Sequence, residues 1–552
     1  MIDSIRITIN GKTKEYTRGI TLSEIAGDYQ ENYKYPIILA KVNNNLRELS
    51  YALTKDSTVT FLDLTDPAGN RTHISGLTYL LIYAIKELYG RSKDITVEHS
   101  IDKGIYVKTN FTLTEDKLKE IKNKMKEIAK TDTPITKLTI DRLEAIDYYE
   151  KIKNHAKAEV LRFNTNTYVT LYRLGNLYDY FYNFMPTLTS QIQAFDLTYL
   201  DSGSFVLRFP TVFESDKISP YHHHPNMFDA FTEYSKWASI MNVETTSDIN
   251  KIVSTGKIND LIHIDETLQN SKLLDVAKKI NKNRKEVKIV LLAGPSSSGK
   301  TTTSRKLCMY LHSFGLNPKV ISMDDYFKNL KEVPKKEDGS YDFESLRAVN
   351  MDLFDSQIER LLKGDTVKIP TYNFILGRKE YIDKIDLEKD EILLIEGIHA
   401  LDKAVLKNIP RNKKTKIYIS PLTELRIDSH NRISTTDNRL LRRIIRDNRT
   451  RGYKVEDTLA TWPAVREGEE NYIFTCQDEA DITINSALIY EIGVLRTYVE
   501  PLLYNVDVSS PYYEEAKRLM NFLRLFLPVP SDDIPQDSVL REFIGNSYFN
   551  AL

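Results

Sequence analysis

Residues 294–302 read "GPSSSGKTT" and follow the apolar stretch "KIVLLA" at 288–293. The spacing Gly294-x-x-x-x-Gly299-Lys300-Thr301 is typical of a loop that binds phosphate. Glycines let successive backbone N–H groups turn toward one anion, and a helix beginning near Gly299 directs its positive end to the same point. Lys300 supplies a cation, and the Thr301 hydroxyl a ligand for Mg²⁺. We therefore predict a site for ATP and Mg²⁺ formed by Gly294, Ser296, Ser297, Ser298, Gly299, Lys300, Thr301 and Thr302.

Around this loop the chain alternates between apolar strands and helical segments. The strand-like stretches are "KIVLLAG", "KVISMDD", "EILLIEGI", "KIYIS" and "DITINS". Buried strands separated by helices predict an α/β fold with a parallel sheet and helices on both faces. We assign residues 284–552 to this domain, including a helical tail.

More than half of the chain precedes the loop, and its patterns predict three further parts. Residues 1–66 alternate like short strands around a helix that Thr21 and Glu24 open as a capping box, so we predict a small β-grasp module. Residues 67–215 form a mixed α and β domain, in which a helical period begins at Leu77. Residues 216–283 are predominantly helical and act as a connector.

Composition restricts the class of protein. Among 552 residues, 76 Lys and Arg balance 77 Asp and Glu, which gives no support for general attraction to nucleic acid or membrane. The two cysteines, Cys308 and Cys476, form no CxxC pair, which excludes a disulfide framework and a cysteine-based zinc cluster. No apolar run reaches the roughly 18 residues that span a bilayer. We expect a cytoplasmic protein without a membrane segment.

Two further strands of this domain end in carboxylates. "ISMDDYFK" ends with Asp324 and Asp325, and a carboxylate at this end of a parallel strand can accept a proton from a substrate hydroxyl. We predict Asp324 as the catalytic base; the alternative is that both acids bind metal or cap a helix. "EILLIEGIHAL" ends in Glu396, which we predict holds Mg²⁺ with Thr301.

A helix rich in arginine follows at "DNRLLRRIIRDNRTRGY", residues 437–453. Leu440, Leu441, Ile444 and Ile445 form one stripe, and Arg439, Arg442, Arg443 and Arg446 flank it. So many guanidinium groups behind a phosphate loop favour a lid that neutralises transferring phosphate. The alternative is a solvated basic face.

These elements together resemble the uridine kinase/phosphoribulokinase family of P-loop kinases over residues 287 to about 500. The resemblance is carried by "GPSSSGKTT", "SMDDYFK", "YDFESL", "IPTYNF" with "GRKE", "LLIEGIHAL" and "RLLRRIIRD". It implies that Asp324 activates a nucleoside 5′-hydroxyl, with Lys300, Arg442 and Arg443 as further catalytic groups. It implies an acceptor site formed by Asp325, Tyr326, Tyr372, Arg378, Arg439 and Arg446.

The chain departs from this family at its acceptor side. The family's "FDHPDAFD" segment supplies an aspartate to ribose hydroxyls, but the chain reads "FESLRAVN", with Arg347 at that place. The histidine that follows the tyrosine motif in the family is also absent, since Leu376 and Gly377 stand there. Because buried donors and acceptors set selectivity among hydroxylated substrates, the acceptor is left open.

The front of the chain resembles two parts of threonyl-tRNA synthetase. Residues 1 to about 65 resemble a TGS domain, and residues 70 to about 210 resemble its editing domain. The editing residues of that enzyme correspond to Ser75, Tyr79, Phe181 and Met185. Since none of these side chains is the histidine or cysteine of that site, we predict no editing activity. We interpret His222, His223 and His224 as part of a surface loop.

The whole arrangement resembles uridine kinase-like bacterial nucleoside kinases. We expect a kinase for a small-molecule hydroxyl, with a nucleoside 5′-hydroxyl favoured. One alternative is a non-nucleoside acceptor, such as a sugar phosphate or vitamin precursor, which Arg347 could meet as a cation. Another is a regulatory ATPase whose front half contacts RNA or tRNA. The sequence leaves the donor, ATP or GTP, and the oligomeric state open.

Overall fold

The computed structural model describes residues 4–336, 339–373, 376–388 and 391–549. At the front, a five-stranded sheet has the order β2-β1-β5-β3-β4. The Thr21 hydroxyl accepts from the Glu24 N–H, and the Glu24 carboxylate accepts from the Thr21 N–H, so the predicted capping box is present. The elements are β1 (Ser4–Ile9), β2 (Lys12–Thr17), α1 (Leu22–Ala26), β3 (Leu39–Val42), β4 (Asn45–Glu48) and β5 (Ser57–Leu62).

The second part combines helices with two antiparallel sheets, β10-β9-β8 and β11-β12-β7-β6. Its first helix begins at Pro67, ten residues before the start that we predicted at Leu77, because Asp66 caps it and its first turns bury polar side chains. The elements are α2 (Pro67–Tyr89), β6 (Ile95–Ile101), β7 (Gly104–Thr109), α3 (Glu115–Ala129), β8 (Ile135–Asp141), α4 (Arg142–Lys151), α5 (His155–Arg162), β9 (Tyr168–Leu174), β10 (Leu177–Asp179), β11 (Asp196–Asp201) and β12 (Ser204–Arg208).

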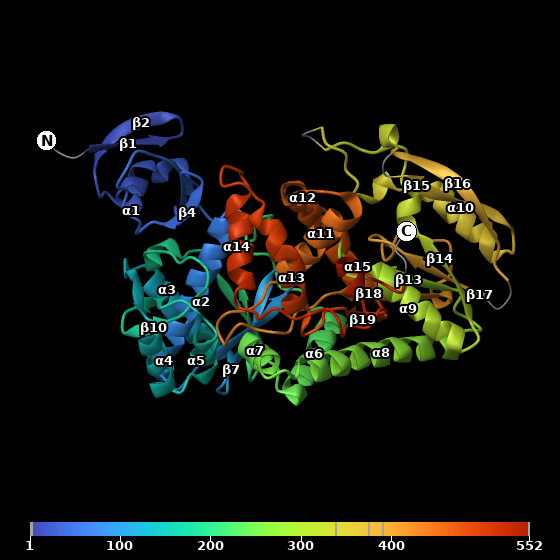
Figure 1. Ribbon diagram of the computed structural model, residues 1–552, viewed down its shortest axis with the longest axis horizontal. Coiled ribbons are helices and arrows are strands. Elements are labelled where there is room, and N and C mark those ends of the chain that lie inside the picture. The colour runs from blue at the N-terminus through green and yellow to red at the C-terminus, as the bar shows by residue number, and fades with distance from the viewer. Residues whose placement is uncertain (1–3, 337–338, 374–375, 389–390, 550–552) are drawn as a thin grey trace.

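Three helices lead to the phosphate loop: α6 (Pro225–Met241), α7 (Thr246–Ser254) and α8 (Ile258–Lys282). In Figure 1, α8 runs along the lower edge from α6 toward the C-terminal sheet. Of the three adjacent histidines, His222 and His223 are exposed, but His224 is buried. The His224 imidazole bonds the carboxylate of Asp478 and so joins two parts of the chain. The surface-loop interpretation is therefore right for His222 and His223 and wrong for His224.

The C-terminal sheet has the order β14-β17-β13-β18-β19, and every neighbouring pair is parallel, which confirms the predicted α/β fold. Both faces are buried. Ile289 and Leu291 pack with α10, whereas Val290 and Leu292 pack with α8 and α9. The strands are β13 (Ile289–Ala293), β14 (Asn317–Ser322), β17 (Glu391–Glu396), β18 (Lys414–Ser420) and β19 (Ile482–Asn485).

The helices of this region are α9 (Lys300–Ser313), α10 (Met351–Leu362), α11 (Thr435–Arg451), α12 (Val455–Gly468), α13 (Glu491–Tyr504), α14 (Tyr513–Leu523) and α15 (Arg541–Ile544). A hairpin of β15 (Val367–Asn373) and β16 (Arg378–Ile385) holds the "IPTYNF" and "GRKE" motifs, which we had not predicted as strands. Phe374 of the first motif lies outside the described residues. Among the helices of the described ranges, none combines the length and the apolar character that a bilayer crossing requires.

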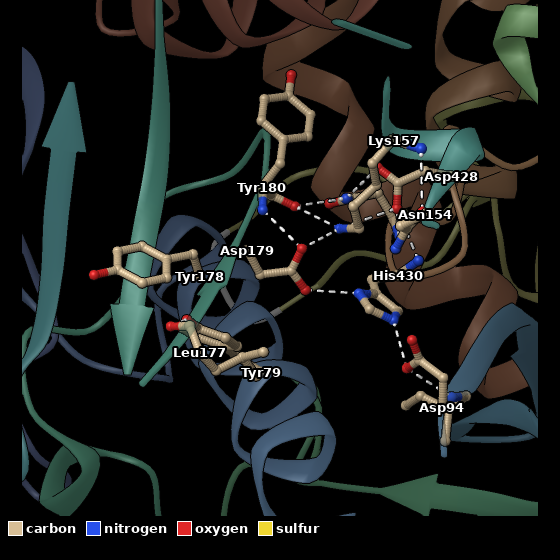
Figure 2. A network of polar contacts seen from close by, with 12 residues as sticks. Tyr79, Asp94, Asn154, Lys157, Leu177, Tyr178, Asp179, Tyr180, Asp428 and His430 are labelled. Carbon is tan, nitrogen blue, oxygen red and sulfur yellow. Dashed lines mark hydrogen bonds and ion pairs between the residues drawn. The ribbon is translucent and has the colours of Figure 1, made fainter. Parts of the chain in front are cut away.

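The second part of the chain and the C-terminal region share one hydrophobic cluster. A single buried cluster includes Tyr149 and Leu161 from the second part, Ile262 from α8, and Leu441 and Leu495 from α11 and α13. Beside it lies the polar network of Figure 2. His430, just before α11, bonds the carboxylates of Asp179 (2.6 Å) and Asp94 (2.9 Å). Lys157 is fully buried and pairs with Asp179 at 2.5 Å and Asp428 at 3.4 Å.

Candidate functional site

Three neighbouring strands bring the predicted catalytic groups to one edge of the parallel sheet. β13 leads into the phosphate loop and lies beside β17, where Leu292 is opposite Glu396. β14 lies on the other side of β17. Its last residue, Ser322, is opposite Glu396, and Asp324 follows two residues later. Ligands of open α/β sheets bind at this carboxyl edge, where the strand order reverses.

The phosphate loop adopts a conformation that requires its two glycines. A Cβ on Gly294 would lie 2.0 Å from the carbonyl oxygen of Ile419, so only glycine fits there. Gly299 has φ +82° and Ser297 has φ 60°, both in the left-handed region. The Lys300 ammonium donates to the carbonyls of Gly294 (3.0 Å) and Pro295 (3.3 Å), which keeps it over the loop.

The residues of the loop fit a nucleotide with Mg²⁺. The hydroxyls of Ser297 and Ser298 are buried, and within the described parts of the chain neither has a hydrogen-bond partner. Buried hydroxyls without partners are costly unless a ligand supplies the acceptor. Thr301 and Glu396 carry oxygen atoms of the kind that Mg²⁺ binds, and this ion prefers few protein ligands together with several phosphate or water oxygens.

The strand-end carboxylates lie in a desolvated, positively charged environment. Burial raises the pKa of Asp324, and the charges of Lys300 and Arg451 oppose that rise. Burial likewise raises the pKa of Glu396 to about 7, against the pull of Lys300. Asp325 has a different role, because its carboxylate accepts from the Tyr372 N–H at 3.1 Å and so fixes the hairpin.

Two arginines of α11 lie behind the phosphate loop. Arg439 and Arg442 are almost completely buried, and they donate to the loop carbonyls of Ser296 (3.0 Å) and Ser297 (3.4 Å). Arg439 pairs with Glu469 and Arg442 with Glu491. We expected both guanidinium groups to contact substrate. Instead, their hydrogen bonds and ion pairs with the protein stabilise the phosphate loop.

Other arginines of the same helix face the site. The Arg443 guanidinium donates to the Ser296 hydroxyl at 2.9 Å. Arg443 (3.2 Å), Arg446 (2.9 Å) and Arg451 (3.3 Å) all pair with the single buried carboxylate of Asp447. Three positive charges against one negative charge leave an excess that can meet phosphate.

The acceptor side differs from the sequence-based expectation. Tyr326 is fully buried and its hydroxyl donates to Gln357 at 2.8 Å, so this side chain belongs to the core and not to an acceptor site. Tyr372 is buried against the ring of Phe327. Arg378 is 63% exposed on the hairpin and lies 3.7 Å from the carboxylate of Glu380. The structure therefore leaves few of the predicted acceptor residues pointing into the site.

Glu344 is a site residue that our sequence reasoning missed. Burial, together with the nearby Glu469 carboxylate, raises the pKa of Glu344 to about 7, and its charge also interacts with Asp324 and Lys300. Arg347, which we expected to meet the acceptor, is exposed and bends back toward the Ser345 hydroxyl (3.5 Å). The sequence contained a signal that could have identified Glu344, because it is the acidic residue of the "FESLRAVN" segment.

The four positions of the editing site hold a packed core. Ser75, Tyr79, Phe181 and Met185 are buried, and the rings of Tyr79 and Phe181 lie 5.3 Å apart. The Tyr79 hydroxyl lies 2.8 Å from each of the carbonyl oxygens of Tyr172 and Leu177, which share its one proton as acceptors. Tyr79, Phe181 and Met185 therefore belong to the hydrophobic core of this part of the chain.

Comparison with known proteins finds a family match within the second half of the chain and relatives of its N-terminal region. Residues 289–492 match the Phosphoribulokinase / Uridine kinase family. The N-terminal region is similar to threonine–tRNA ligases: that of Polaromonas sp. is 30% identical over 179 residues, 32% of this chain and 28% of the ligase. That of Acetivibrio thermocellus is 28% identical over 199 residues, 35% of this chain and 31% of the ligase. The chain thus spans less than a third of these relatives.

Two solved structures are also similar. Phosphoribulokinase from Rhodobacter spheroides is 16% identical, with a TM-score of 0.27, over 44% of this chain and 77% of that protein. A "possible uridine kinase" from Bacillus stearothermophilus is 16% identical, with a TM-score of 0.27, over 39% of this chain and all (100%) of that protein.

Proposed function

Because residues 289–492 form a domain of the Phosphoribulokinase / Uridine kinase family, we propose that this chain is an ATP- and Mg²⁺-dependent kinase whose acceptor is a nucleoside 5′-hydroxyl. The proposal rests on one observation. Asp324 and Glu396 lie at the carboxyl ends of the adjacent parallel strands β14 and β17, Lys300 follows the loop after the next strand β13, and the charges of Arg446 and Arg451 of α11 act on Asp324. A cation, a base and a metal ligand around one phosphate loop are the parts that phosphoryl transfer needs.

The loop holds the donor. Its amides, the Lys300 ammonium and the free hydroxyls of Ser297 and Ser298 bind phosphate oxygens, and Thr301 and Glu396 hold Mg²⁺. Bound Mg²⁺ neutralises charge on the phosphates. Arg443, Arg446 and Arg451 add positive charge to the site, which stabilises the negative charge that spreads as the phosphoryl group leaves.

Asp324 accepts the proton of the acceptor hydroxyl. Its carboxylate lies near Lys300 and the arginines of α11, which favour the ionised form that a base requires. Burial holds its pKa above the usual range and so increases its basicity. The oxygen that loses this proton is then positioned to attack the terminal phosphorus.

Glu344 favours a neutral, hydroxylated acceptor. A carboxylate among the groups of this site can accept hydrogen bonds from ribose hydroxyls, whereas it would repel a phosphorylated sugar. The exposed position of Arg347 removes the cation that motivated an anionic acceptor. Incubating the protein with labelled ATP and a panel of uridine, cytidine, sugar phosphates and vitamin precursors tests this choice, with labelled nucleoside monophosphate as the expected product.

Two variants test the assigned roles in the same assay. Asp324→Asn should lower kcat by about 10²–10⁴-fold and leave Mg²⁺·ATP binding nearly unchanged, because only proton transfer is removed. Lys300→Ala should weaken ATP binding and turnover together. Asp325→Asn is the comparison, and a larger loss of kcat in that variant than in Asp324→Asn would assign the base to Asp325. A labelled sugar bisphosphate in place of the labelled nucleoside monophosphate would overturn the assignment of a nucleoside acceptor.

A further inference from the structure

The end of the described chain lies against the phosphate loop. Figure 1 shows α15 beside the C-terminal sheet and near α9. Leu540 and Phe543 are fully buried, and the Asp537 carboxylate pairs with Lys306 of α9 at 3.0 Å. The segment 535–545 is therefore packed into the domain.

Two side chains of this segment reach the loop itself. The Glu542 carboxylate accepts hydrogen bonds from the Thr302 N–H at 3.1 Å and from the Thr302 hydroxyl at 2.8 Å. Val539 covers Gly299, where a Cβ would come within 2.3 Å of its Cγ2. An anion of the protein thus occupies donors in the first turn of α9, which the loop pattern assigns to phosphate.

Contacts with α11 hold the backbone of α15 in place. Arg449 donates to the carbonyls of Glu542 (2.8 Å) and Phe543 (3.0 Å). The Arg442 guanidinium lies 5.0 Å from the centre of the Phe543 ring. Because the main chain and Phe543 are fixed, the Glu542 side chain is the part that can leave Thr302 by rotation about its own bonds.

We propose that Glu542 is an autoinhibitory anion, which binds Thr302 when no nucleotide is present and must rotate away before a nucleotide phosphate can bind there. This proposal rests on the proposed function, since it takes the loop as the nucleotide site. The Thr302 N–H and O–H cannot donate fully to both the Glu542 carboxylate and a nucleotide phosphate. These two anions would also repel each other at hydrogen-bond distance from the same donors. The tail therefore competes with nucleotide and lowers its apparent affinity.

Calorimetric titration of the full chain with Mg²⁺·ATP, and separately with Mg²⁺ and inorganic triphosphate, tests the competition. Glu542→Gln removes the charge, and Glu542→Asp keeps the charge but shortens the side chain so that it no longer reaches Thr302. Both should lower the Kd by about tenfold, because a charge-assisted contact no longer has to be displaced. Asp533→Asn removes an exposed acid of the same tail and should leave the Kd unchanged.

The outcomes separate this proposal from the proposed function. Equal Kd values for the wild type and both Glu542 variants would refute the competition while the loop remains a nucleotide site. Weaker binding in Glu542→Gln would make Glu542 a nucleotide ligand and also overturn the proposal. If Mg²⁺·ATP bound neither to the wild type nor to any variant, the proposed function would fail together with the inference.

Discussion

At the scale of single residues, the acceptor side depends on which side chain of residues 343–350 points inward. Glu344 interacts electrostatically with Lys300 and Asp324, whereas Arg347 is exposed three residues later. Both are charged and close in the sequence, so only the path of the backbone distinguishes them. We infer that Glu344 and not Arg347 sets acceptor selectivity.

Exchanging each of these two side chains for glutamine tests that inference. Assayed above pH 8, where a carboxyl with a pKa of about 7 is ionised, Glu344→Gln should raise the KM for the nucleoside by about tenfold and leave the Kd for Mg²⁺·ATP unchanged, because a charge-assisted bond to a hydroxyl becomes a neutral one. Arg347→Gln is the matched control and should change neither constant. Steady-state kinetics with uridine compares the KM of the two variants. A higher KM in the arginine variant alone would mean that Arg347, and not Glu344, sets acceptor selectivity.

At the scale of elements, α11 and α13 are joined by a buried ion pair that supports the phosphate loop. Glu491 of α13 pairs with Arg442 and accepts from Asn438, and Arg442 also donates to the Ser486 carbonyl at 2.8 Å. The same helix α13 carries a partly exposed pair, Arg496 with Glu500 at 2.8 Å. A buried charge that loses its partner is far more costly than an exposed one.

The two pairs allow an internal comparison on one helix. Glu491→Gln should lower the free energy of unfolding by about 3 kcal/mol, since the Arg442 charge stays buried without a counter-charge. Glu500→Gln should lower it by no more than about 0.5 kcal/mol. Urea denaturation followed by circular dichroism measures both. Equal losses would mean that Glu491 does not hold Arg442 in the folded protein.

At the scale of the whole molecule, the front of the chain and the helix α11 are connected through His430. Burial lowers the pKa of this imidazole, but Asp179 and Asp94 outweigh it and raise the pKa to about 9. A folded-state pKa above the ordinary value of about 6.5 means that the folded protein holds the proton more tightly. The resulting stabilisation is complete below about pH 6.5 and disappears as the pH rises through about 9.

Comparison of the wild type with His430→Gln isolates this contribution. The difference between their free energies of unfolding, measured by urea denaturation, should be largest at pH 6. It should decrease by up to about 3 kcal/mol by pH 9.5. His263→Gln alters an exposed histidine of α8 and should match the wild type at every pH. A difference between wild type and His430→Gln that stays constant with pH would show that His430 is not charged in the folded protein.

Local signals in the sequence predicted most of the elements and the phosphate loop. The glycine spacing at 294–299, the strands before Asp324 and Glu396, the capping box at Thr21 and the apolar stripe of α11 all depend on neighbours within a few residues. Such patterns record burial and backbone conformation directly. The α/β fold and the convergence of Lys300, Asp324 and Glu396 follow from them, because parallel strands present their carboxyl ends at one edge.

The tertiary structure alone decided which charged groups face the site and which support it. Arg439 and Arg443 are one helical turn apart, yet one is paired behind the loop and the other donates to the Ser296 hydroxyl in front. Glu542 meets Thr302 across 240 residues of sequence. A charge pattern does not specify its partner, because pairing depends on the packing of distant elements and on the cost of burying an unpaired charge.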